Sequence, residues 1–170
     1  MSWRTILIIV LASLGLWQGY DNWRLRRLTP RARYDITARI LGREDYHVDR
    51  LSDLVPEDRA LGWGPMSDNR VLRAFEITQA ARFYSWVPRE ALPIPRREVI
   101  EHSANTHVIP ADAGVRRRLE RLRIGQVVHL SGFLVNAVRD DGAYLNTSLT
   151  RSDSGPGSCE VLLVEQLEAW

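Results

Sequence analysis

The sequence predicts an α+β chain that is mainly β, built as a small and partly closed barrel with one amphipathic helix. Three observations lead to this prediction. About six segments show the alternating or continuously apolar pattern of strands. Only residues 112–125 combine a helical period with start and stop signals. An apolar run at the N-terminus stands apart from the rest and predicts a transmembrane helix before the barrel.

The N-terminal segment, residues 3–20, is 18 residues long, and it has no charge from Thr5 to Tyr20. As a helix it spans about 27 Å, close to the thickness of a hydrocarbon core. Trp3, Trp17 and Tyr20 lie at its edges, where aromatic rings favour the membrane interface. We therefore expect residues 1–21 to anchor the chain in a lipid bilayer, followed by one globular domain over residues 22–170. A cleaved signal peptide is the alternative.

Arginines flank this segment unequally. One lies just before its uncharged part, Arg4, and the others follow the segment: Arg24, Arg26, Arg27, Arg31 and Arg33. The positive-inside rule, applied literally, places the domain in the cytoplasm. The same arginines alternate with Trp23, Leu25 and Leu28, so they also fit an edge strand of the domain, which would leave the side of the membrane open.

Charge is distributed unevenly along the chain. Residues 1–33 hold six Arg and one Asp, a net charge of +5, whereas residues 34–170 hold 17 Arg and 20 acidic residues, a net charge of −3. The domain therefore lacks the basic character of nucleic-acid binders, and no nucleic-acid partner is expected. The chain has no Lys, which excludes Schiff-base and P-loop chemistry. No cofactor motif is present.

The first half of the domain predicts short elements. A half-buried strand is expected over Tyr34–Leu41, because alternate residues from Tyr34 to Ile40 are apolar. We then expect a loop over residues 42–52, a helix over residues 56–61 and a turn around Trp63. A second helix, capped by Ser67 or Asp68, is expected to bury Val71, Leu72 and Phe75. A strand over residues 83–87 and a loop over residues 88–95 complete this half.

The second half is more regular. Asp112 predicts the start of a helix with Val115, Leu119 and Leu122 on one face, and Gly125 predicts its end. The helix is followed by a strand buried on both faces, over residues 126–138, and by a turn at residues 140–142. The chain then forms a returning strand (143–149), a loop (151–158) and a final strand (159–167). Strands in this order, with one helix, favour an OB-like barrel.

The densest group of polar side chains lies in residues 101–107. His102 and His107, with Asp112 nearby, suggest a hydrolase or a zinc site. However, a spacing of five puts the two imidazoles on opposite faces of a strand, so no metal is predicted. Ser103, Asn105 and His107 share one strand face, which favours a polar binding surface. Hydrogen-bonded structural residues are the alternative.

Three further positions are candidates for binding. Trp63 lies between two glycines, either as a core residue at a turn or as a ligand platform. Arg151 and Asp153 lie in a glycine-rich loop that suits either an anion site or a local ion pair. Cys159, the only cysteine, is expected to be a buried structural thiol.

Four stretches carry a resemblance to a known family: YDITARILGREDYHVDR, DRALGWGPMSD, PIPRREVIEHSANTHVIPAD and SLTRSDSGPGSCEVLLVE. Through them the chain resembles an uncharacterised family of bacterial proteins predicted to be exported or membrane-anchored. The resemblance covers nearly all of residues 24–170 and implies a Gram-negative source and export of the domain. It therefore favours a single-pass inner-membrane protein with a periplasmic domain, against the literal arginine count.

Two classes of function follow. The first is a periplasmic binding or assembly module that uses Trp63, Ser103, Asn105, His107, Arg151 and Asp153, with another envelope protein as its partner. The second is a hydrolase or metal-dependent enzyme centred on His102, His107 and Asp112. The enzyme hypothesis requires these three side chains to meet in one pocket.

Overall fold

Five strands form a closed ring in the computed structural model, which describes residues 26–152, 155 and 157–170. The neighbours around the ring are β1-β2-β5-β8-β6, and β6 pairs again with β1. Their bounds are β1 Arg26–Asp45, β2 Glu57–Gly62, β5 Ser103–Pro110, β6 Val127–Arg139 and β8 Glu160–Ala169. β5 and β8 run parallel, and the other pairs in the ring are antiparallel. The predicted mainly β architecture with few helices and a ring-like sheet is therefore confirmed.

The long strand β1 closes the ring. Residues 26–39 pair with β6 and residues 39–45 pair with β2, with irregular register near residues 31 and 41. The predicted inward face from Tyr34 to Ile40 is confirmed. The loop predicted over residues 42–52 is wrong at its start, because pairing with β2 extends the strand to Asp45.

The helix predicted over residues 56–61 is wrong, because Glu57–Gly62 forms the fully buried strand β2. Its charged residues are paired inside the protein. Arg59 has no exposed side-chain surface and bonds the carboxylates of Glu57 (2.5 Å) and Asp45 (2.9 Å). Asp58 faces the other way, towards His107. A buried strand rich in charges is tolerated only when each charge has such a partner.

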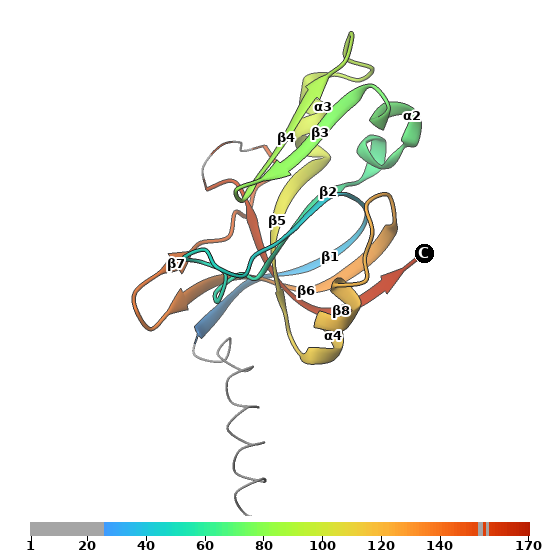
Figure 1. The fold of residues 1–170 in the computed structure, drawn as a ribbon. Helices are drawn as coiled ribbons and strands as arrows, with labels where there is room; N and C mark the ends of the chain where they lie inside the picture. The colour runs from blue at the N-terminus through green and yellow to red at the C-terminus, as the bar shows by residue number, and fades with distance from the viewer. Residues whose placement is uncertain (1–25, 153–154, 156) are drawn as a thin grey trace, which may run out of the picture.

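A hairpin with three short helices is inserted between β2 and β5 and projects from one end of the barrel (Figure 1). It comprises η2 Gly64–Ser67, α2 Asn69–Leu72, β3 Phe75–Ala80, β4 Phe83–Pro88 and α3 Arg96–Glu101. The cap at Asp68 and strand β4 are confirmed. Phe75 was wrongly expected in the second helix. It begins β3, where it packs in a small core with Met66 and Val99.

Helix α4 (Ala113–Leu119) covers the opposite end of the barrel (Figure 1). Asp112 accepts hydrogen bonds from the backbone N–H groups of Gly114 and Val115, so the predicted cap is confirmed. Val115 and Leu119 lie in the barrel core. The helix ends at Leu119, so the end predicted at Gly125 is wrong, and Leu122 joins the core from just after the helix.

Strand β6 is fully buried on one face and half-buried on the other, whereas full burial on both faces was predicted. Its register shifts at Gly132, where an added Cβ would lie 1.9 Å from the carbonyl oxygen of Leu163. The returning strand is shorter than predicted, since β7 spans only Tyr144–Leu145. The final strand is confirmed as β8.

The predicted anchor, residues 1–21, lies outside the described residues. Within the described part of the chain, no helix combines the length and apolar character needed to cross a membrane.

Candidate functional site

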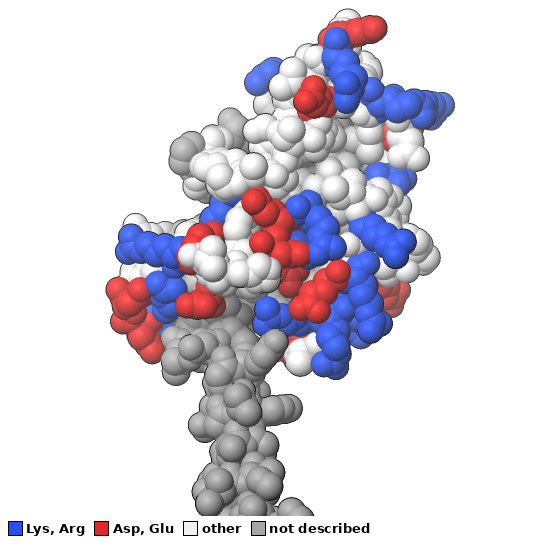
Figure 2. Space-filling view, in the orientation of Figure 1, with Lys and Arg blue, Asp and Glu red and all other residues white. Residues whose placement is uncertain are grey.

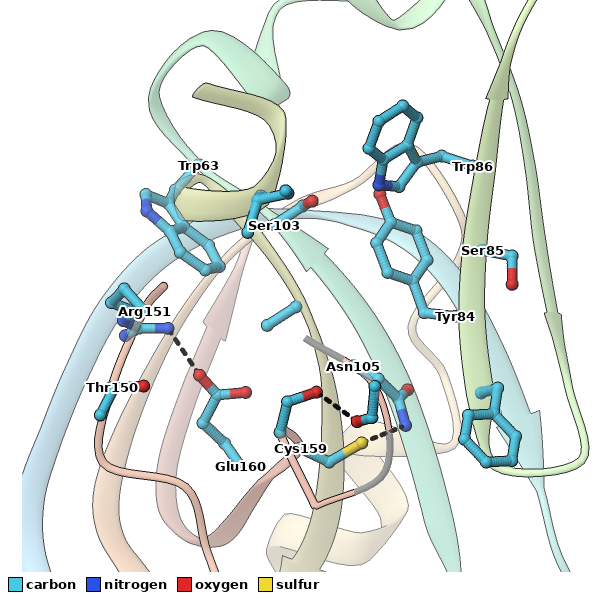
Figure 3. A pocket seen from close by; sticks show the side chains of 15 residues that line it. Trp63, Tyr84, Ser85, Trp86, Ser103, Asn105, Thr150, Arg151, Cys159 and Glu160 are labelled. Carbon is cyan, nitrogen blue, oxygen red and sulfur yellow. Dashed lines mark hydrogen bonds and ion pairs between the residues drawn. The ribbon is translucent and has the colours of Figure 1, made fainter. Parts of the chain in front are cut away.

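A pocket of about 320 Å³ lies between the barrel and the inserted hairpin. Residues of β4 form one wall, and the start of β5 forms the floor. The connection leading into β8 supplies the other side, through Thr150, Arg151 and residues 158–160. Segments far apart in the sequence therefore meet here (Figure 3).

Aromatic rings flank the pocket on two sides. Tyr84 and Trp86 point into it from β4, and Trp63 faces them from the turn after β2 (Figure 3). Trp86 packs edge-on against Phe75 with the ring centroids 5.6 Å apart, which fixes the indole in place. Burial raises the pKa of Tyr84 to about 12, so its hydroxyl stays neutral. Trp63 is thus a pocket residue, as the ligand-platform hypothesis requires.

Arg151 is held at the pocket edge by three neighbours. Its guanidinium donates to Glu160 Oε1 at 2.9 Å and to the hydroxyl of Tyr34 at 3.0 Å. It also lies over the Trp63 ring, 4.5 Å from the centroid. The predicted partner Asp153 lies outside the described residues. Because Glu160 is nearly buried and balances the arginine, this edge of the pocket carries little net charge.

Ser103 and Asn105 share one face of β5, as predicted, and both line the pocket. They are buried, whereas an exposed surface was expected. Ser103 Oγ donates to the carbonyl oxygen of Val99 at 2.7 Å. Asn105 Oδ1 accepts from Gln79 at 2.7 Å, and its Nδ2 donates to the carbonyl oxygen of Arg82 at 3.0 Å. The two side chains are therefore held rigidly in the floor.

His107 lies next along the same face of β5, behind the pocket, and is also buried. Its Nδ1 donates to Asp58 Oδ1 at 2.7 Å. Cys159 lines the pocket beside it and is only half-buried, so the expectation of a buried thiol was wrong. The cause is its position just before β8, where the chain leaves the pocket edge and enters the sheet.

The structure does not bring His102, His107 and Asp112 together. His102 precedes β5 and lies 2.9 Å through Nδ1 from the carbonyl oxygen of Glu98, whereas Asp112 follows β5 and caps α4. At about 3.3 Å per strand residue, the five-residue spacing of the two histidines corresponds to about 16 Å of extended backbone. Among the described residues, no group of three His, Cys, Asp or Glu side chains is arranged to hold a metal ion.

Sequence reasoning missed four residues of this region: Asp58, Tyr84, Trp86 and Glu160. The run from Phe83 to Trp86 did carry a signal, because Tyr84 and Trp86 share one face of a strand that was predicted. Asp58 carried none, because its stretch was interpreted as a helix. The pairing of β2 with β5 sets Asp58 opposite His107.

Charged side chains of both signs lie side by side on the face of the barrel seen in Figure 2. This mixing matches the small net charge of residues 34–170. On that face the surface offers no extended field of one sign.

Comparisons with known proteins give little further information. No protein-family model matches the chain, and no curated protein matches it significantly. The solved structure of the protein PriB from Ralstonia solanacearum is 14% identical, with a TM-score of 0.34, over 80% of this chain and 94% of that chain. A similarity this low carries no argument about the function of this chain.

Proposed function

We propose that the chain is a membrane-anchored binding module of the bacterial envelope, and that the pocket between the barrel and the β3–β4 hairpin receives its partner. One observation carries this proposal. The same pocket is lined by four residues that the sequence identified separately: Trp63, Ser103, Asn105 and Arg151. A concave site with aromatic walls and a few fixed polar groups is the usual form of a binding site.

We infer further that the barrel is OB-like. The ring order, the parallel closure between β5 and β8, and a helix between β5 and β6 support this assignment. In OB-like barrels the ligand face is formed by the second and third strands and by the loop before the last strand. Here these are β2, β5 and residues 146–159, and the pocket draws on β5 and on that loop.

The pocket favours an uncharged group of the partner. Arg151 and Glu160 neutralise each other, and the phenol of Tyr84 is neutral because its pKa is raised. The walls supply apolar ring surface, and the fixed side chains of the floor are already hydrogen-bonded. A neutral group with an apolar face, presented by another envelope protein, fits this lining best.

Partner capture tests the pocket. The full-length tagged chain, cross-linked in cells and purified in detergent, should retain a discrete partner. Trp63→Ala should lose most of that partner, because it removes one wall of the pocket and the support of Arg151. Arg117→Ala is the matched control, since Arg117 is exposed on α4 at the other end of the barrel. Equal capture by both variants would contradict the proposal.

The location is tested separately by reporter fusions. We propose a periplasmic domain, because the resemblance to exported proteins outweighs the arginine count. A reporter fused after Trp170 that is active only in the periplasm should then be active, and a cytoplasmic reporter should be silent. The opposite pattern would place the domain in the cytoplasm.

A further inference from the structure

The only cysteine of the chain lies in the pocket, where a bound molecule can reach it. Cys159 is half-buried and lines the pocket beside Asn105. The Nδ2 group of Asn105 donates to its sulfur at 3.6 Å (Figure 3). A thiol at this position differs from the inert buried cysteines of protein cores.

An imidazole connects this sulfur to a buried carboxylate. Nδ1 of His107 donates to Asp58 Oδ1 at 2.7 Å. Nδ2 of Asn105 lies 3.2 Å from Asp58 Oδ2 and 3.6 Å from the Cys159 sulfur, so the thiol lies beside this pair, and the imidazole interacts with it. Because Nδ1 is occupied by Asp58, the nitrogen available to the sulfur is Nε2. Asp58, His107 and Cys159 therefore form a series of carboxylate, imidazole and thiol. In enzymes with such a series the imidazole is the base that activates the nucleophile, and the carboxylate orients the imidazole.

The carboxylate of this series is fixed from several sides. Asp58 has no exposed side-chain surface. Its Oδ2 accepts from Asn105 at 3.2 Å and from the hydroxyl of Tyr46 at 3.1 Å, and Arg82 lies 3.9 Å from Oδ1. The Asp58 carboxyl group is thus held pointing at His107, which fixes the orientation of the imidazole.

The charge on His107 agrees with this geometry. Burial alone would lower its pKa, but the hydrogen bonds to Asp58 and Cys159 outweigh burial and raise the pKa to about 9. His107 therefore carries a positive charge at neutral pH. An imidazolium beside a cysteine sulfur favours the nucleophilic thiolate.

The hydroxyl groups in the pocket are less suitable nucleophiles. Ser103 Oγ donates its proton to the carbonyl oxygen of Val99, and Ser158 Oγ donates to that of Gly155. Among the described residues, the imidazole of His107 hydrogen-bonds Asp58 and neither of these hydroxyl groups.

We propose that Cys159 is a nucleophile that accepts an acyl group from an uncharged ester or thioester bound in the pocket, with His107 as its base and Asp58 as the positioning residue. The near-neutral lining and the volume of about 320 Å³ suit a small acyl group with an apolar face. The proposal rests on the pocket of the proposed function, but it does not require a protein partner.

The reaction balances without an oxidant or a metal. In the resting state the thiol proton already lies on Nε2 of His107, and the thiolate sulfur bonds to the acyl carbon. The bond from that carbon to the alcohol oxygen or thiol sulfur breaks, and the leaving group takes the proton from His107. Water then attacks the enzyme thioester and gives one proton to Nε2 of His107, a carboxylic acid is released, and the Cys159 thiolate beside the imidazolium is restored.

Two reagents test this proposal on the full-length chain in detergent. With p-nitrophenyl acetate, intact mass should show one added acetyl group per chain, located on Cys159 by peptide mapping, and Cys159→Ala should show none. His107→Gln should acylate about 100-fold more slowly, the usual contribution of a general base. His102→Gln, which alters an imidazole outside this series, should match the parent.

Iodoacetamide gives a second test, and its first comparison needs no variant. At pH 7 the folded parent should react at least about tenfold faster than the same chain unfolded in urea, because only the folded chain places the imidazole beside the sulfur. Asp58→Asn should move the pH profile of alkylation towards that of the unfolded chain. A folded chain that reacts no faster than the unfolded one, or acetylation away from Cys159, would overturn the proposal.

The two proposals fail separately. Loss of partner capture in Trp63→Ala without any thiol reactivity in the parent would retain the binding module and refute the nucleophile. A reactive Cys159 in a chain that captures no partner would retain the nucleophile and refute the binding module.

Discussion

Nδ1 of His107 lies 2.7 Å from Oδ1 of Asp58, and this pair links β5 to β2 inside the wall of the barrel. Asp58 is fully buried and His107 nearly so. The pair therefore contributes to stability in a way that depends on the protonation of the imidazole.

Stability should fall as pH rises across the range in which His107 loses its proton. The pKa of His107 is raised from 6.5 to about 9 in the folded chain, so its stabilising effect is fully present below about pH 6.5 and is lost as pH rises through 9. Urea denaturation of the full-length chain at pH 6.5 and pH 9.5 measures this. His107→Gln should show a flatter dependence, and His102→Gln should keep the dependence of the parent. Identical slopes in parent and His107→Gln would contradict the assignment.

The buried charges of β2 predict a strong and non-additive mutational effect. Arg59→Met leaves Glu57 and Asp45 without their shared cation, which should cost about 3–5 kcal/mol of unfolding free energy. Burial raises the pKa of Glu57 to about 7, so this carboxylate is already destabilised in its charged form. Adding Glu57→Gln to Arg59→Met should recover part of the loss. Chemical denaturation of both variants measures their unfolding free energies. The prediction is contradicted if the effects of the two substitutions on the unfolding free energy simply add.

Gly132 predicts a backbone effect at the closure of the barrel. An added Cβ would lie 1.9 Å from the carbonyl oxygen of Leu163, so Gly132→Ala must displace β6 from β8. We expect a loss of more than about 2 kcal/mol, against about 0.5 kcal/mol for Ser131→Ala next to it. Thermal unfolding compares the two, and equal melting temperatures would show that the strands accommodate the methyl group.

Elements with a clear apolar period could be predicted from the sequence, and α4 is the best example. Asp112 caps it, and Val115 and Leu119 lie in the core as their spacing predicted. Strand β2 could not be predicted, because its charged residues hide its burial. Their partners are distant in sequence, as with Asp58 and His107, and only the folded sheet brings them together.

The candidate site shows the same limit. Local signals identified four of its residues: an aromatic residue at a turn (Trp63), one face of a strand (Ser103 and Asn105) and a glycine-rich loop (Arg151). Nothing in these signals showed that the four residues lie together. The inserted hairpin supplies the missing wall through Tyr84 and Trp86.

Photocross-linking inside living cells tests the central claim, that the pocket is the binding surface. A photoreactive phenylalanine analogue at Phe83, an exposed pocket residue, should give a discrete cross-linked product. The same analogue at Val48, which is exposed outside the pocket, should not. The product from position 83 should disappear in Trp63→Ala. Equal products from both positions, or a product from position 83 that persists in Trp63→Ala, would contradict a binding function of the pocket.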